Sequence, residues 1–189
     1  MNKLLATLLV TLLLAALFSC EPALEDPYEN FVIPSGKHDN GWKMQSLQSK
    51  TLSFSAIFNQ SAIYETQTQE NQHDINKLMG FADCNSNHHQ NSARFGWRWL
   101  EGKLEIHAYA YVNGERRTEL IGIVDLDQAF DYQLQLTNDH YVFYLQGYDL
   151  VKIERNAPCT RGLYYMLYPY FGGDETAPHD ILIQVLTKY

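Results

Sequence analysis

The chain has 189 residues, of which 46% are hydrophobic and 13% aromatic, and its formal net charge at pH 7 is −8. This length fits a single domain, and the apolar and aromatic content excludes a disordered tail. The chain is acidic overall and has no run of Lys or Arg, so it lacks the electrostatic footprint of a duplex-binding protein. We therefore expect no nucleic-acid partner.

The N-terminus has the pattern of an export signal. Lys3 precedes an apolar stretch from Leu4 to Phe18, and Ser19 then stands before a cysteine. We predict a signal peptide over residues 1–19. Leu17-Phe18-Ser19-Cys20 resembles a bacterial lipobox, which implies that Cys20 is acylated and becomes the mature N-terminus. The alternative is an ordinary cleaved signal peptide with a chance cysteine.

An acidic segment follows the cysteine. Residues 21–29 contain four acids, two prolines and no base, and we predict an extended tether over residues 20–30. The acidic cluster resembles the surface-export tether of lipoproteins in Bacteroidetes-type bacteria, many of which handle polysaccharides. This resemblance implies a protein anchored by lipid in the cell outer membrane and exposed at its surface.

Two further cysteines lie in the predicted domain. Export places Cys84 and Cys159 in a compartment that permits disulfides, and a bridge across this separation would stabilise the fold by on the order of 4 kcal/mol. Two separately buried, reduced cysteines are the alternative. Neither cysteine has the C-x-x-C spacing of a thiolate zinc site, and we predict no metal and no cofactor.

Residues 31–189 are predicted to form one domain dominated by alternating apolar and polar residues. In the clearest run, 104–112, one face is apolar and the other polar and aromatic. Similar alternation marks residues 52–58, 132–136 and 181–185.

Turn signals such as Glu101-Gly102 and Asn113-Gly114 separate these runs. The spacing predicts ten or more antiparallel strands, and the fold class is all-β: an antiparallel β-sandwich of the jelly-roll kind. Residues 59–77 are ambiguous. They fit either a loop with a short strand at Ile63-Tyr64 or a short helix around Asp74–Leu78.

A polar loop and a strand follow at residues 83–99. On the strand, the aromatic side chains share one face and are expected in the core, while Arg94 and Arg98 share the other. Gly96 between them is predicted to let a ligand approach the backbone, since Arg binds carboxylates or sulfates through paired donors. His88-His89 in the loop could bind a metal, but a solvated loop is favoured.

Residues 167–181 combine tyrosines, a Gly-Gly acidic turn and Ala-Pro-His-Asp at the start of the last strand. This pattern is similar to the closing hairpin of concanavalin A-like jelly-roll proteins. That group includes lectin-like surface lipoproteins, polysaccharide lyases and glucanases. The carboxylates of Asp174, Glu175 and Asp180 could coordinate Ca²⁺, but a solvated acidic turn is favoured.

Three functions remain open. The glucanase pattern Glu-x-Asp-x-x-Glu is absent. Glu105-Ile106-His107 resembles the Gln-Ile-His strand of alginate lyases, which neutralise a uronate carboxylate and abstract its C5 proton with Tyr or His. However, Glu in place of Gln adds a negative charge where an anionic sugar would bind, and the Tyr-x-Lys-x-Gly-x-Tyr stretch of those lyases is absent.

We therefore predict a cell-envelope lipoprotein with a non-catalytic, lectin-like carbohydrate-binding module, to which we assign no catalytic residue. A jelly-roll lyase acting on uronate-containing glycans and a purely structural surface lipoprotein are the alternatives. The expected partners are the membrane, through the lipid, and an extracellular polysaccharide. An exposed polar-aromatic sheet face should hold the sugar, with tyrosines 164, 168 and 170 on a neighbouring strand. The candidate ligand-binding residues are Arg94, Arg98, Glu105, His107, Tyr109 and Tyr111.

Overall fold

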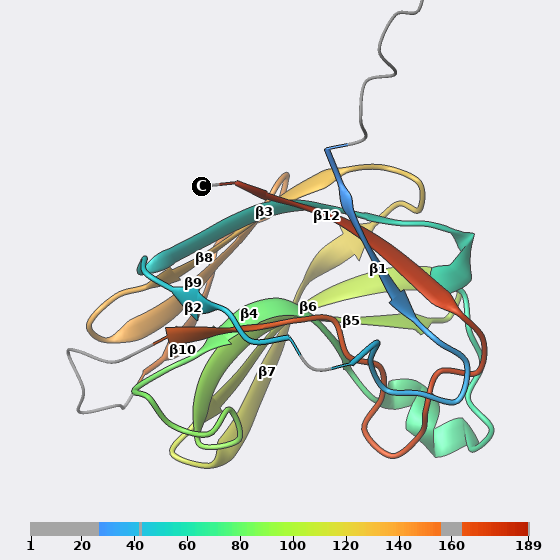
Figure 1. The fold of residues 1–189 in the computed structure, drawn as a ribbon, viewed down its shortest axis with the longest axis horizontal. Coiled ribbons are helices and arrows are strands. Elements are labelled where there is room, and N and C mark those ends of the chain that lie inside the picture. The colour runs from blue at the N-terminus through green and yellow to red at the C-terminus, as the bar shows by residue number, and fades with distance from the viewer. Residues whose placement is uncertain (1–26, 42, 156–163, 189) are drawn as a thin grey trace, which may run out of the picture.

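The structure is a computed structural model that describes residues 27–41, 43–155 and 164–188. Within these ranges the chain forms two six-stranded antiparallel sheets that face each other (Figure 1). The prediction of an antiparallel β-sandwich of the jelly-roll kind is confirmed. The predicted signal peptide, its lipobox with Cys20, and most of the tether lie outside the described residues.

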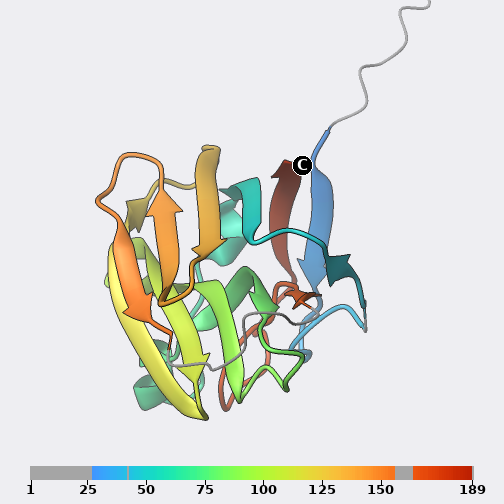
Figure 2. The ribbon, with the colours of Figure 1, turned by 90° about the vertical axis from the view of Figure 1, so that its left-hand side faces the viewer.

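The first sheet contains both ends of the described chain. Its strands, in spatial order, are β1 (Glu29–Ile33), β12 (Ile181–Lys188), β3 (Thr51–Phe58), β8 (Phe130–Leu136), β9 (His140–Leu145) and β10 (Val151–Glu154). β1 begins at Glu29, two residues before the domain start that the sequence suggested. It pairs with β12, so the first and last strands lie side by side (Figure 2).

The second sheet carries the candidate site on its outer face. Its strands, in spatial order, are β2 (Ser46–Leu47), β11 (Tyr164–Leu167), β4 (Asn76–Ala82), β5 (Asn91–Leu100), β6 (Lys103–Val112) and β7 (Glu115–Val124). Two-residue turns at Glu101-Gly102 and Asn113-Gly114 join β5, β6 and β7, and all four turn residues have positive φ. These turns were predicted, since short hairpins favour residues that tolerate that conformation.

Residues 59–75 are mostly loop, but the strand expected at Ile63-Tyr64 and the helix expected around Asp74–Leu78 do not form. The segment forms two 3₁₀ helices, η1 (Gln60–Ala62) and η2 (Gln69–His73), and β4 then starts at Asn76. All seven residues of β4 are buried, because the core covers one face of the strand and loops cover the other. A strand buried on both faces has no alternation to reveal it.

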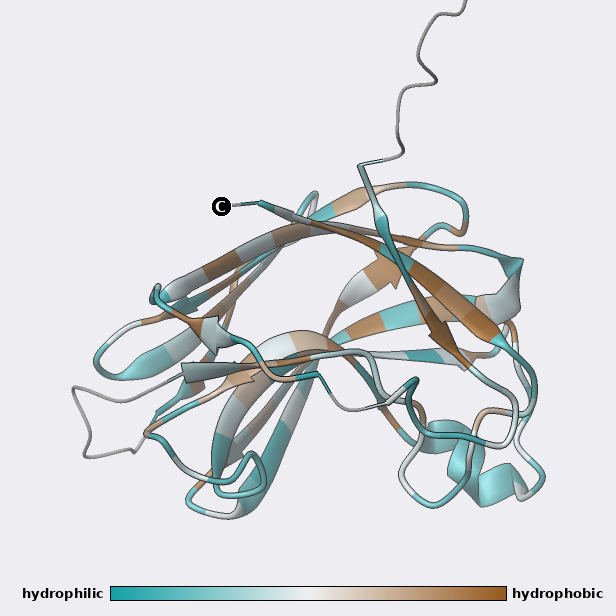
Figure 3. Ribbon diagram, in the orientation of Figure 1, coloured by the Kyte–Doolittle hydropathy of each residue, from teal (hydrophilic) through white to brown (hydrophobic). Residues whose placement is uncertain are grey.

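The core lies between the sheets. Predicted apolar positions on β6, Leu104 and Ile106 among them, are no more than 2% exposed, and the strands carry most of the hydrophobic residues (Figure 3). Aromatic rings fill the centre, where Tyr132 stacks on Phe54 with centroids 4.9 Å apart. Among the described residues, no helix is long and apolar enough to cross a membrane.

A buried ion pair stands beside Cys84. Asp83 is fully buried, and its carboxylate accepts hydrogen bonds from Arg155 Nε at 2.5 Å and from the Tyr141 hydroxyl at 2.8 Å. These bonds connect β9 and the end of β10, at one side of the first sheet, to the loop before β5. Cys84 is disulfide-bonded. Cys159, its predicted partner, lies outside the described residues, so the pairing stays a prediction.

Candidate functional site

A cation-rich cavity of about 300 Å³ lies on the outer face of the second sheet. We call it the cationic cavity. Three of its lining residues carry a positive charge (Lys77, Arg94 and Arg116), and the described residues that line it include no Asp or Glu. The other lining residues are His88, His89, Tyr109, Tyr111, Tyr170, Gly172 and Gly173.

Strand register brings these residues together. Arg94 on β5 lies opposite Tyr109 on β6, and Tyr111 lies opposite Arg116 on β7. Directly opposed residues project from the same face of a sheet. On the other side of β5, the pairing of β4 with β5 is irregular between Lys77 and Gly80. A Cβ on Gly80 would lie 2.1 Å from the Ala93 carbonyl oxygen. Only glycine permits this close approach of β4 to β5.

Arg94 is the most deeply placed of the three cations. Its side chain lies over the ring of Tyr109, with Cζ 5.5 Å from the ring centroid, and the residue is only 6% exposed. Its Nε is buried and has no hydrogen-bond partner among the described residues. A buried guanidinium without an acid is costly, because its lost hydration is not replaced. An anion in the cavity would supply the missing partner.

Lys77 is a second buried cation of this cavity, and the charge of Asp74 acts on it from outside the lining. Its Nζ donates to the carbonyl of Gly172 at 2.7 Å and lies 5.3 Å from the ring centroid of Tyr109. Burial, together with the charge of Arg94, lowers the pKa of Lys77 from 10.5 to about 8. The lysine is therefore still mostly charged at pH 7.

His88 and His89 form part of the cavity wall. Their ring centroids are 4.3 Å apart, and His89 lies 5.3 Å from Tyr111. Burial, followed by the positive charges of Arg94 and its neighbours, lowers the pKa of His88 to about 4, so this imidazole is neutral at pH 7. No group of three or more potential metal-binding side chains occurs among the described residues.

Two residues of β6 that we expected on an exposed sheet face are buried. Tyr109 is 3% exposed and His107 is 5% exposed, so these two predicted face residues are buried. Loops and the start of β4 cover them. Burial and the hydrogen bond with Tyr111 raise the pKa of Tyr109 to about 12, so its phenol keeps its proton at neutral pH.

The other three candidates bind one another outside the cationic cavity. Arg98 Nε and His107 Nε2 contact the same oxygen of Glu105, at 2.6 and 3.0 Å. Partial burial opposes ionisation of Glu105, but these two hydrogen bonds keep the pKa of its carboxyl below the usual value. Because Arg98 compensates its charge, Glu105 does not repel an anionic sugar as the sequence suggested.

Gly96 does not leave room for a ligand. A Cβ at this position would lie 2.3 Å from Cγ2 of Ile75 and 3.2 Å from the carbonyl oxygen of Asn76. The chain itself therefore occupies the space that we assigned to an incoming molecule. The glycine serves the approach of β4 instead.

A second cavity, of about 440 Å³, continues the cationic cavity. The two share His88, Arg94 and Tyr170 as lining residues. Of the three tyrosines expected on the neighbouring strand, only Tyr170 lines the cationic cavity. Tyr164 and Tyr168 pack against the core. The two cavities therefore lie side by side, and we call them together the binding groove; Asp39 lines its second part.

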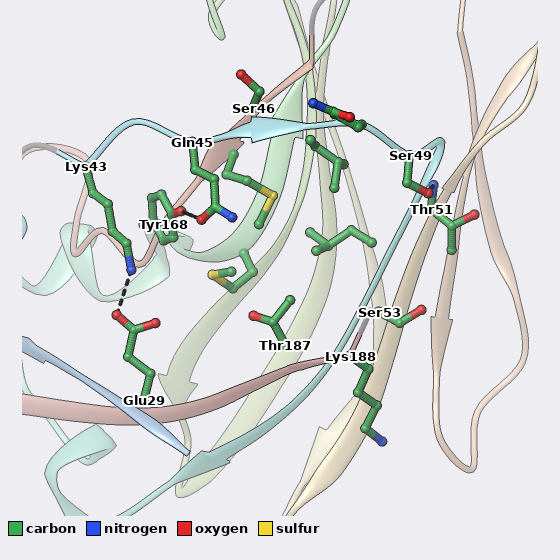
Figure 4. A pocket seen from close by; sticks show the side chains of 15 residues that line it. Glu29, Lys43, Gln45, Ser46, Ser49, Thr51, Ser53, Tyr168, Thr187 and Lys188 are labelled. Carbon is green, nitrogen blue, oxygen red and sulfur yellow. Dashed lines mark hydrogen bonds and ion pairs between the residues drawn. The ribbon is translucent and has the colours of Figure 1, made fainter. Parts of the chain in front are cut away.

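A third cavity, of about 540 Å³, lies at the open edge between the sheets (Figure 4). Leu47, Leu52, Met79 and Met166 give it an apolar lining. Its charged residues are already paired, since Lys43 contacts Glu29 at 2.6 Å and Lys188 contacts Asp131 at the same distance. It therefore offers an anion much less than the cationic cavity does.

Sequence reasoning missed Lys77 and Arg116. Arg116 could have been predicted from the sequence, because a two-residue turn at Asn113-Gly114 places it opposite Tyr111. Lys77 could not be predicted, because β4 has no alternation of apolar and polar residues and the irregular pairing of β4 with β5 places this side chain in the cavity. Of the six candidates, the structure brings Arg94, Tyr109 and Tyr111 into the cavity.

Neither known protein families nor curated protein sequences show a match to this chain. Solved structures do. The alginate lyase AlyC3 matches with a TM-score of 0.60 at 11% identity, over 85% of this chain and 74% of that one. The alginate lyase from Klebsiella pneumoniae gives 0.55 at 14% identity, over 73% of this chain and 58% of its own length, which is under two thirds.

A third match comes from work on endo-acting O-glycanases that members of the human gut microbiota express to initiate mucin breakdown. Its TM-score is 0.54 at 16% identity, over 90% of this chain and 83% of that one. At such low identities these similarities concern the fold alone. The chain has a concanavalin A-like jelly-roll fold.

Proposed function

We propose that this protein binds an acidic extracellular glycan and holds an anionic sugar unit in the cationic cavity. The observation that carries the proposal is Arg94, a buried cation whose Nε has no partner among the described residues, in a cavity with no carboxylate in its described lining. Arg binds carboxylates and similar anions through paired donors. The aromatic walls at Tyr109, Tyr111 and Tyr170 suit the apolar faces of sugar rings.

Two further observations support this proposal. The second cavity, of about 440 Å³, shares Arg94 with the cationic cavity and so offers room for a neighbouring sugar. Two of the three similar solved structures are alginate lyases and the third comes from work on O-glycanases, so all three concern glycans. A glycosidase reaction in the cationic cavity is disfavoured, because it needs a pair of carboxyl groups.

A glycan microarray tests the proposal directly. We expect the purified protein to bind acidic polysaccharides, and to bind neutral polysaccharides of similar length at least tenfold more weakly. Binding to neutral glycans alone would contradict the role of Arg94. If no glycan binds, the purely structural surface lipoprotein becomes the better account.

β-Elimination at the same site is a second candidate, favoured by the presence of His88 and Tyr109 beside Arg94 in the lining of the cavity. A neutral His88 can accept the C5 proton of a uronate whose carboxylate Arg94 neutralises. The electron pair then forms the C4–C5 double bond, the C4–O bond breaks, and the phenol of Tyr109 gives its proton to the departing oxygen. Ultraviolet absorbance of the unsaturated product would distinguish this lyase from a binding module.

We also propose that the protein is anchored in the outer membrane through Cys20. The signal peptide, the lipobox-like tetrad and the acidic tether support this location. An anchor of several acyl chains is effectively permanent. The binding groove would then face glycans outside the cell.

A further inference from the structure

The charge of the cationic cavity exceeds what one sugar carboxylate can neutralise. Arg94 alone can satisfy both oxygens of a carboxylate, because its donors lie in a planar fork. Lys77 and Arg116 would then still face the cavity without an acid in its described lining. A uronate bound to Arg94 therefore does not pair with Lys77 or Arg116, although the charge of Asp74 acts on Lys77 from outside the lining.

The three cations approach the cavity from different sides. Lys77 comes from β4, Arg94 from β5 and Arg116 from β7, on the far side of Tyr111. The charge of Arg116 helps to lower the pKa of Lys77 and opposes the rise in the pKa of Tyr109, so Arg116 acts on the same space. Arg117, the next residue, projects from the opposite face and contacts Glu115 at 3.8 Å.

We infer that the anionic unit bound in this cavity carries a sulfate ester, so that the ligand class is a sulfated acidic glycan. A sulfate ester adds a negative charge and presents three terminal oxygens in a tetrahedral arrangement. It can therefore accept hydrogen bonds from cations on different sides, whereas a planar carboxylate is satisfied by one guanidinium. This inference rests on the proposed function and names the substrate class of the same site.

The inference assigns different roles to the cations. Arg94 is buried and is needed by either anion. Arg116 is exposed at the mouth of the cavity and gains a partner only when a second anionic group is present. Removing Arg116 should therefore abolish the preference for sulfated over unsulfated glycans.

Isothermal titration calorimetry with two hexasaccharides tests this inference. Chondroitin and chondroitin sulfate share their uronates and differ in sulfation. We expect the sulfated form to bind the wild-type protein at least tenfold more tightly, since a charge-assisted hydrogen bond is worth about a factor of ten or more. Arg116→Gln should lose this advantage, and Arg117→Gln, the matched control, should retain it.

Each outcome has a distinct meaning. Equal affinity of wild-type protein for both hexasaccharides would overturn the sulfate inference and leave acidic-glycan binding intact. An equal loss of preference in both variants would show that general surface charge causes the preference, and it would overturn the sulfate inference. A preference that survives Arg116→Gln would overturn the sulfate inference as well. If neither hexasaccharide nor any other acidic glycan binds, the proposed function itself fails.

Discussion

Two buried tyrosines of the first sheet differ in the partners of their hydroxyl groups. The hydroxyl of Tyr132 is buried and has no hydrogen-bond partner among the described residues, and burial raises its pKa. The hydroxyl of Tyr141 donates to Asp83 at 2.8 Å. An unsatisfied buried hydroxyl costs free energy, whereas a bonded one contributes to stability.

We predict opposite effects for the two Tyr→Phe substitutions. Tyr132→Phe keeps the ring that stacks on Phe54 and should leave the free energy of unfolding unchanged or raise it by up to about 1 kcal/mol. Tyr141→Phe should lower it by about 1–3 kcal/mol, because Asp83 loses a donor. Urea unfolding measures both. A loss of more than about 1 kcal/mol for Tyr132→Phe would show that its hydroxyl has a partner.

Lys77 gives the proposed binding a pH dependence. Burial and the charge of Arg94 lower the pKa of its ammonium group to about 8, and only the charged form attracts an anion. A bound anion stabilises that form and raises the pKa again. Affinity should therefore be nearly constant from pH 6 to pH 7 and fall several-fold by pH 9.

Calorimetry at pH 8 in two buffers with different ionisation enthalpies should show that ligand binding takes up protons. Lys77→Met should bind more weakly at pH 7 and show no decline between pH 7 and pH 9. A decline of the same size in Lys77→Met would assign the titration to another group.

At the level of single residues, three of the six candidates predicted from the sequence line the cationic cavity. Arg94, Tyr109 and Tyr111 could be predicted because their strands alternate clearly. The pairing of Glu105 with Arg98 and His107 could not be predicted, because residues on one face can bond one another as readily as they bond a ligand. The predicted exposure of His107 and Tyr109 was also wrong, because the loops that cover them have no periodic sequence pattern that would predict their position.

At the scale of elements, the turn after Phe171 positions one wall of the cavity. Gly172 has φ of +84°, and a Cβ there would lie 2.0 Å from the carbonyl oxygen of Glu175. Its own carbonyl accepts the hydrogen bond from Lys77. Gly36 also has positive φ, at +72°, but a Cβ there would meet nothing within 4 Å.

These two glycines form a matched pair for substitution. Gly36→Ala should cost about 1 kcal/mol, the strain of the left-handed conformation alone. Gly172→Ala should cost at least twice as much and should also weaken glycan binding, because the turn must move away from Lys77. Thermal unfolding and calorimetry measure the two effects. Equal costs for the two variants would show that the contact with Glu175 relaxes without consequence.

The elements themselves could be predicted unevenly. β3, β6, β8 and β12 follow from alternation, and the short turns follow from residues that accept positive φ. β4 could not be predicted because it is buried on both faces. Strand order was also beyond the sequence pattern, because alternation assigns a face and does not name the neighbouring strand.

At the scale of the whole molecule, the protein must be exported to the cell surface to bind an extracellular glycan. Labelling of cells with an alkyne fatty acid should mark the wild-type protein and leave Cys20→Ala unmarked, because Cys20 is the predicted acylation site. Both forms should be detected by immunoblotting as a control for expression. Equal labelling of the two proteins would contradict the lipobox assignment.

The central claim is that Arg94 in the cationic cavity binds the anionic group of a glycan. Its most direct test is calorimetric titration of wild type and Arg94→Gln with an acidic oligosaccharide found by the array, with thermal unfolding as a control for folding. The account predicts a loss of affinity of at least tenfold in Arg94→Gln, with cooperative unfolding retained or improved, because a buried unpaired charge is removed. Unchanged affinity in a folded Arg94→Gln variant would contradict the account.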